Sequence, residues 1–211
     1  ICVTKYVQIS EIIKELMNMK VSFSPPDMSE LEMAEVVDAI QSGWITTGPK
    51  TKEFERKIAE YVTAPRAVCL NSQTACAEMA LRILGIGVDD EVIVPAYTYS
   101  ATASVVSHVG ARLRFIDIQK NSLEMDYEEL EQAISERTKV IIPVDLGGIP
   151  CDYERIFEIV EKKKNLFRPS NKIQNAMGRI SVNADAAHAF GAEWHGKMVG
   201  SIADFSSFSF H

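Results

Sequence analysis

Residues Val182–Phe210 read VNADAAHAFGAEWHGKMVGSIADFSSFSF. The apolar beginning of this stretch predicts a strand that ends at Asp185, and a turn-rich connection leads to a second strand that ends near Ser209. A carboxylate at the end of a buried strand is costly unless it meets a cation. Because the neighbouring sequence supplies no such partner, we expect Asp185 to face a cationic group brought from elsewhere.

Upstream of this stretch, short apolar runs alternate with helical patterns. The strand candidates are residues 67–70, 91–95, 111–117, 139–144, 179–185 and 203–210, and the helix candidates between them are residues 73–84, 99–108, 126–135 and 152–163. This alternation predicts an α/β fold with three layers, α/β/α, around a mostly parallel sheet. Ligands bind such sheets beyond the carboxyl ends of the strands.

The N-terminal part has a different pattern. We expect residues 1–24 to form a peripheral lead-in with a short helix, and residues 25–211 to form one large domain. Ser29 and Glu32 have the spacing of a capping box, which predicts a helix that runs to Ser42.

Three further local predictions follow from the sequence. A second helix is expected at residues 52–62. Asp126 and Glu129 form another potential capping box. Residues 165–175 are mainly polar, which indicates a surface loop.

Composition and charge exclude several classes of protein. The 211 residues are 46% hydrophobic and 24% charged, which is typical of a globular domain, and the net charge of −7 argues against a nucleic-acid-binding surface. The first residues lack a basic region followed by an apolar run, and no stretch reaches about 18 apolar residues, so we expect neither a targeting leader nor a membrane span. The four cysteines lack the spacing of a metal site or of a disulfide framework, which indicates reduced thiols in a cytoplasmic protein and no bound metal.

The segment after the first strand candidate could bind a phosphate. Residues 71–75 read NSQTA and open a helix, where free N–H groups and the helix dipole attract anions. The hydroxyl of Thr74 could add a contact. Serine and threonine are also ordinary helix caps, so this segment alone leaves both interpretations open.

Two tyrosines follow the next strand candidate. Tyr97 and Tyr99 come at its carboxyl end, where one of them could stack on a heteroaromatic ring. Ordinary core tyrosines are the alternative. A protonated pyridine nitrogen would satisfy Asp185, and His188 either lies near such a ring or only makes local hydrogen bonds.

These signals fall in a familiar order, and the chain resembles the pyridoxal phosphate (PLP)-dependent sugar aminotransferases of the DegT/DnrJ type. The resemblance extends over residues 21–211 and is carried by ITTGPKTKEFE (45–55), NSQTACAEMAL (71–81), DEVIVPAYTYSAT (90–102), RTKVIIPVDLGGIPCDY (137–153), DAAHAFGAEWHGKMVGS (185–201) and FSFH (208–211). It implies the large PLP-binding domain of the aspartate aminotransferase fold. The cofactor-binding roles implied are Thr74 and Ala75 at the phosphate, Tyr99 over the ring, Asp185 at the pyridine nitrogen, His188 beside it and Ser209 near the phosphate.

Two features depart from the family pattern. Gln73 stands where many members have glycine, and the loop at residues 165–175 is longer than in many members. The family's Schiff-base lysine would come three residues after His211, so we expect no catalytic residue within this chain. The domain at residues 25–211 is then incomplete, and the small C-terminal domain of the family is missing.

The resemblance also implies an activity. We expect an aminotransferase that moves an amino group from an amino acid, glutamate in the first instance, to a keto nucleotide-sugar in cell-surface polysaccharide biosynthesis, and that works as a homodimer. The chain as it stands would be inactive. One alternative is a dehydratase of the same family with histidine in place of the lysine. Another is a non-catalytic fragment that binds PLP or pairs with a longer partner. A different nucleotide-binding domain is disfavoured because no GxGxxG or GxxxxGK[ST] motif occurs.

Overall fold

The computed structural model describes residues 25–211, and these belong to two units, one that ends at Gly48 and one that comprises Pro49–His211. The first unit contains α2 (Glu30–Gln41). Its N-cap is Ser29, and the predicted capping box with Glu32 is present. The helix predicted within residues 1–24 lies outside the described residues.

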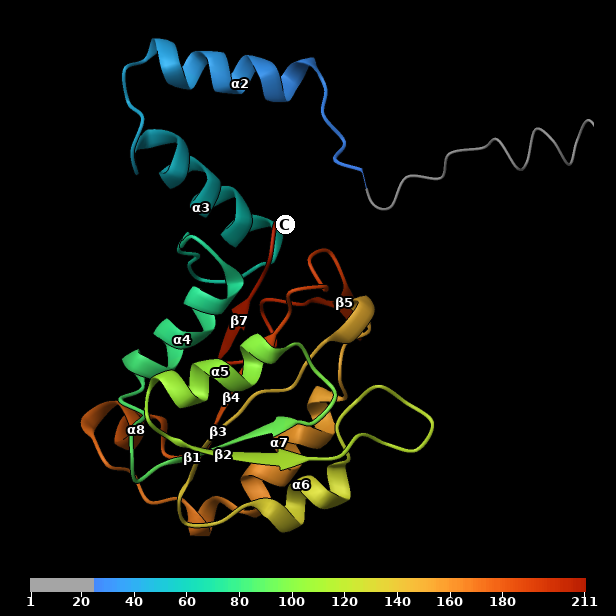
Figure 1. Ribbon diagram of the computed structural model, residues 1–211. Coiled ribbons are helices and arrows are strands. Elements are labelled where there is room, and N and C mark those ends of the chain that lie inside the picture. The colour runs from blue at the N-terminus through green and yellow to red at the C-terminus, as the bar shows by residue number, and fades with distance from the viewer. Residues whose placement is uncertain (1–24) are drawn as a thin grey trace, which may run out of the picture. The chain divides into compact units, whose positions relative to one another are not determined.

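A parallel five-stranded sheet forms the centre of the second unit (Figure 1). The strands lie side by side in the order β2-β1-β3-β4-β7, and every neighbouring pair is parallel. Their bounds are β1 (Glu91–Pro95), β2 (Arg112–Ile116), β3 (Thr138–Ile141), β4 (Ser181–Asp185) and β7 (Phe205–Ser207). The predicted α/β class with a mostly parallel sheet is confirmed.

Helices cover both faces of this sheet, with α4 and α5 on one side and α6 and α7 on the other (Figure 1). The helices of this unit are α3 (Pro49–Tyr61), α4 (Gln73–Ile83), α5 (Ser100–His108), α6 (Tyr127–Ala133), α7 (Tyr153–Lys162) and α8 (Lys172–Met177), with short 3₁₀ helices η1 (Leu146–Gly148) and η2 (Lys164–Leu166).

The alternation of side chains along the strands explains the three layers. In β1, Val92 and Val94 belong to the core that packs on α4 and α5, whereas Ile93 belongs to the core that packs on α6 and α7. All three are fully buried. Because successive residues of a strand point to opposite faces, an apolar run without polar interruptions requires a covering layer on each side.

The strand predicted at residues 67–70 does not form, and that prediction is wrong. Val68 is 70% exposed and Leu70 is 42% exposed. The N–H of Cys69 donates to Glu55 Oε1 of α3 at 3.0 Å instead of to a neighbouring strand. A backbone whose N–H is held by a side chain in this way does not join the sheet ladder.

Two other local predictions need correction. Residues 165–175 are not a continuous loop, because they include part of η2 and the start of α8, whose cap Asn171 accepts from the N–H groups of Ile173 and Gln174. Asp126 caps α6 as predicted. However, Glu129 accepts from the N–H of Asp117 at 2.7 Å, because the N–H of Asp126 already donates to the Asp117 carbonyl.

The connection from β4 to β7 contains a small antiparallel hairpin of β5 (Glu193–Trp194) and β6 (Lys197–Met198). Beyond it, Gly200 has a φ of +115°, and a Cβ built there would lie 2.8 Å from the Cβ of Val62. Only glycine allows this close approach without strain. The chain therefore passes against the end of α3 before it enters β7.

Candidate functional site

Asp185 ends β4 and is 5% exposed. Burial raises the pKa of this carboxyl group, whereas hydrogen bonds from Thr102 and from the backbone of Ala187 lower it. Thr102 Oγ1 donates to Asp185 Oδ2 at 2.7 Å, and the N–H of Ala187 donates to Oδ1 at 3.3 Å. These donors favour the ionised carboxylate in a buried place, which suits a group that must hold a cation.

The hydroxyl that contacts Asp185 comes from the helix after β1. Thr102 lies in the first turn of α5 and is 1% exposed. The hydroxyls of Thr98 and Thr102 are 2.7 Å apart. Since Thr102 donates to the carboxylate, Thr98 is the donor within this pair, and the two hydroxyls form a chain that ends on Asp185.

Residues of α4 and β7 lie close to the carboxylate as well. Ser207 pairs in register with Asp185, so their side chains point to the same face of the sheet. Gln73, the first residue of α4, donates from Nε2 to Ser207 Oγ at 2.9 Å. Its side chain also lowers the pKa of the Asp185 carboxyl group, with a smaller effect than those of Thr102 and Ala187.

The N-terminus of α4 has the arrangement of an anion site. Ser72 is the N-cap, and its Oγ accepts from the N–H of Ala75 at 3.1 Å. The N–H of Ala75, which the family resemblance assigns to a phosphate, is thus shared with the cap. The N–H groups of Gln73 and Thr74 cannot have intrahelical partners and face outward with the positive end of the helix dipole.

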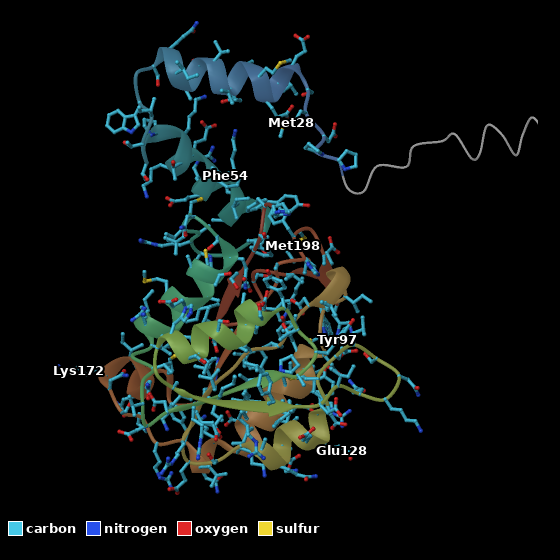
Figure 2. The ribbon with its side chains drawn as sticks, viewed as in Figure 1. Met28, Phe54, Tyr97, Glu128, Lys172 and Met198 are labelled. Carbon is cyan, nitrogen blue, oxygen red and sulfur yellow. The ribbon has the colours of Figure 1, made fainter. Side chains whose placement is uncertain are left out.

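The two tyrosines at the carboxyl end of β1 are not core residues. Tyr97 is 55% exposed and lies in the loop before α5, where Figure 2 labels it. Tyr99 is the N-cap residue of α5 and is 77% exposed. Their exposed rings at the ligand-binding end of the sheet are available for stacking, and the alternative of ordinary core tyrosines is wrong.

His188 is exposed, and its Nδ1 lies 3.3 Å from the backbone nitrogen of Gly147. Because the backbone N–H is the donor, neutral His188 carries its proton on Nε2. A local hydrogen bond of this kind was one of the two alternatives that the sequence allowed for His188. Ser209 is half-buried and follows β7, whereas Ser207 is the serine that lies beside Asp185.

A second buried acid, Asp145, lies next to Asp185 and was missed in the sequence. Its N–H donates to the Asp185 carbonyl at 3.0 Å, and its side chain accepts from Cys151 N at 2.9 Å and from Tyr153 Oη at 2.8 Å. Burial raises the pKa of Asp145 to about 6, despite these hydrogen bonds. Asp145 follows the apolar run IIPV, as Asp185 follows its strand, so the same reasoning applied there would have found it.

Comparison with known proteins identifies the family. Residues 26–211 match the DegT/DnrJ/EryC1/StrS aminotransferase family. The chain belongs to this family. The resemblance seen in the sequence is therefore confirmed.

Comparison with individual solved and curated proteins shows how much of each chain is matched. The putative sugar aminotransferase Spr1654 from Streptococcus pneumoniae, solved in apo, PMP and PLP forms, is 57% identical. In its apo form the TM-score is 0.90 over 92% of this chain and 48% of that chain. The spore coat polysaccharide biosynthesis protein SpsC of Bacillus subtilis is 39% identical over 90% of this chain and 45% of its own length. This chain spans about half the length of these relatives.

A solved structure of a dehydratase also matches. It is a GDP-4-keto-6-deoxymannose-3-dehydratase with a trapped PLP-glutamate geminal diamine. Its sequence is 25% identical, and the match has a TM-score of 0.76 and covers 87% of this chain and 45% of that chain.

Within residues 25–211, no helix is long and apolar enough to cross a membrane. In the same residues, no group of three or more His, Cys, Asp or Glu side chains is placed to hold a metal ion.

Proposed function

We propose that residues 25–211 are the PLP-binding domain of a sugar aminotransferase, which transfers an amino group from glutamate to a keto nucleotide-sugar. The observation that carries this proposal is the buried Asp185 carboxylate, which is held by hydrogen-bond donors at the carboxyl end of a parallel strand. Membership of the family and the names of its solved members support the same function.

The donor set fits PLP. Among the described residues, no lysine or arginine forms an ion pair with Asp185, and His188 is the side chain whose charge lowers the pKa of this carboxyl group. The pyridine nitrogen of PLP, protonated beside an acid, is a cation of suitable size. At the other end of the site, the first turn of α4 offers N–H groups to a phosphate.

Each of these residues has a distinct task in the proposed reaction. When bound, PLP supplies an electron sink for the substrate carbon. Asp185 would keep the proton on the pyridine nitrogen, and Thr102 would hold the carboxylate in orientation. Thr74 and Ala75 would hold the phosphate together with Ser209, and Tyr99 would cover the ring and exclude water.

The substrate, the assembly and the location belong to the proposal as well. A nucleotide-sugar substrate and a role in cell-surface polysaccharides are supported by the names of the relatives. The protein would act as a homodimer. The described cysteines, Cys69, Cys76 and Cys151, are free thiols, as expected in the reducing cytoplasm.

Binding of pyridoxine 5′-phosphate tests the cofactor site. This analogue has no aldehyde and therefore cannot react with surface lysines. We expect it to bind the chain non-covalently, as measured by calorimetry, and we expect Asp185→Asn to weaken binding by about 10- to 100-fold, since a hydrogen bond to a charged group contributes about 1.5–3 kcal/mol. Equal affinity of the wild type and the variant would reject Asp185 as the pyridinium partner.

A dehydratase of the same family is the second candidate, favoured by the match to the GDP-4-keto-6-deoxymannose-3-dehydratase. The two activities give different products from a keto nucleotide-sugar and glutamate. Mass spectrometry of the product made by the whole protein should show an amino sugar, and a deoxy sugar without nitrogen would favour the dehydratase. In the whole protein, Asp185→Ala should abolish either reaction.

A further inference from the structure

Gln73 lies between the two ends of the candidate site. It is the first residue of α4, directly before Thr74, and it is only 8% exposed. A glutamine at the start of a helix normally extends into water. Here its side chain instead turns inward and donates from Nε2 to Ser207 Oγ at 2.9 Å.

Ser207 connects this amide to the strand that carries Asp185. Ser207 pairs in register with Asp185, and its Oγ donates to the carbonyl of Ala184 at 3.2 Å. Gln73 therefore reaches a hydroxyl that is bonded to β4 one residue before the acid. The same side chain lowers the pKa of the Asp185 carboxyl group against the effect of burial.

A rigid cofactor makes this link important. In a bound PLP molecule the distance from the phosphate to the pyridine nitrogen varies little. The helix end that binds the phosphate and the carboxylate that binds the nitrogen must therefore be held at a matching separation. Among the interactions described for the first residues of α4, the side chain of Gln73 is the one that reaches β7.

We propose that Gln73 is a positioning residue whose side-chain amide ties the first turn of α4 to β7 beside Asp185, so that the phosphate-binding and nitrogen-binding ends of the site keep the separation that PLP requires. This inference rests on the proposed function. Gln73→Leu removes the amide and keeps the size of the side chain, so it isolates the hydrogen bonds.

The first measurement uses the cofactor-free chain. Titration of the Asp185 carboxyl carbon by ¹³C NMR, assigned with Asp185→Asn, should show the midpoint rise in Gln73→Leu, because the variant loses a polar side chain that lowers the pKa of this carboxyl group. Gln73→Glu should raise it further, because a second negative charge is placed beside the first.

The second measurement separates the two ends of the site. Calorimetry should show that Gln73→Leu weakens the binding of pyridoxine 5′-phosphate by up to about tenfold, in keeping with the loss of the hydrogen bond to Ser207. Inorganic phosphate, which occupies only the end at α4, should bind to the wild type and the variant equally well within about twofold.

Gln174→Leu is the matched control. Gln174 is 2% exposed and donates from Nε2 to the Leu84 carbonyl at 3.0 Å, in α8 and away from Asp185. We expect this variant to lower the stability of the fold while it leaves the Asp185 midpoint unchanged. A midpoint that moved equally in both variants would reduce the role of Gln73 to general stability and would overturn the inference.

The outcomes distinguish this inference from the proposed function. If the wild type binds pyridoxine 5′-phosphate but folded Gln73→Leu shows neither a changed midpoint nor weaker binding, the role of Gln73 is rejected and the cofactor site stands. Equal weakening of pyridoxine 5′-phosphate and phosphate also rejects it, because Gln73 would then act on the phosphate end alone. If the wild type fails to bind pyridoxine 5′-phosphate, both the proposed function and the positioning role are rejected.

Discussion

At the scale of the residue, Asp145 and Asp185 are two buried acids with different surroundings. Asp145 follows β3, and Asp185 ends the neighbouring strand β4. Asp185 accepts from a hydroxyl and a backbone N–H and faces the candidate cofactor site. Asp145 is 1% exposed and is enclosed by Cys151 and Tyr153. The negative charge of Asp185 adds to the effect of burial on Asp145 and further raises its pKa. Two close carboxylates are rarely both ionised, so this arrangement favours the charge on Asp185.

Asp145 should make the stability of the fold depend on pH. Its pKa of about 6 in the folded state exceeds the value of about 3.9 expected in the unfolded chain. Between these values the folded state binds the proton more tightly, so the free energy of unfolding falls as the pH rises through this window, by up to about 3 kcal/mol at 1.36 kcal/mol per pKa unit.

Asp145→Asn removes this contribution. We expect the difference in free energy of unfolding, variant minus wild type, to increase as the pH rises from about 4 to about 6, and then to level off. Urea denaturation at several pH values measures it, and the other acids cancel in the difference. Two parallel pH profiles would show that Asp145 has an ordinary pKa.

At the scale of the element, the cap of α4 is predicted to contribute to both stability and ligand binding. Ser72→Ala removes the hydrogen bond from the N–H of Ala75 to Ser72 Oγ, at a typical cost of about 1 kcal/mol. For a chain of this size, that corresponds to a fall of roughly 2–4 °C in Tm. Thermal unfolding followed by circular dichroism measures the change.

The matched control for that prediction is Ser29→Ala. Ser29 caps α2 in the same way, but none of the residues in α2 is buried. We therefore expect its loss to leave the main unfolding transition within about 1 °C, well below the effect of the α4 cap. Equal shifts of Tm in both variants would mean that the cap of α4 contributes no more to the stability of the fold than the cap of α2 does.

At the scale of the whole molecule, the unit that ends at Gly48 exposes many apolar side chains. Leu31, Val36 and Ile40 of α2 are more than half exposed, as are Trp44 and Ile45 after it. Apolar groups gathered in this way are typical of surfaces that pair with another protein. They support the proposed homodimer, for which an obligate interface would bury about 2,000 Å² or more in total.

Trp44→Ala and Ile45→Ala test this assembly. Trp44 also contacts its own chain, because its Nε1 donates to the Thr47 carbonyl at 3.0 Å, whereas Ile45 is 81% exposed. We expect the wild type to sediment as a dimer at micromolar concentration and both variants to dissociate more readily. If only Trp44→Ala weakens the dimer, its effect is on the local turn; a wild-type monomer would contradict the proposed pairing of this chain.

The sequence by itself predicted the strands of the central sheet, most of the helices around them and one buried acid of the candidate site. Apolar runs of strand length predicted β1 to β4 and β7 because alternation along a strand is a local property, and the acid after a buried strand marked Asp185. The strand predicted at residues 67–70 was wrong, since a local pattern contains no information on whether a partner strand is present.

Only the tertiary structure decided which side chains meet. In the order β2-β1-β3-β4-β7, β4 lies between β3 and β7, and this places Asp145 beside Asp185 and Ser207 in register with it. Thr102 and Gln73 reach this point from two different helices. Hydrogen bonds between such distant residues depend on how the sheet and its helices pack, and no periodicity along the chain encodes that packing.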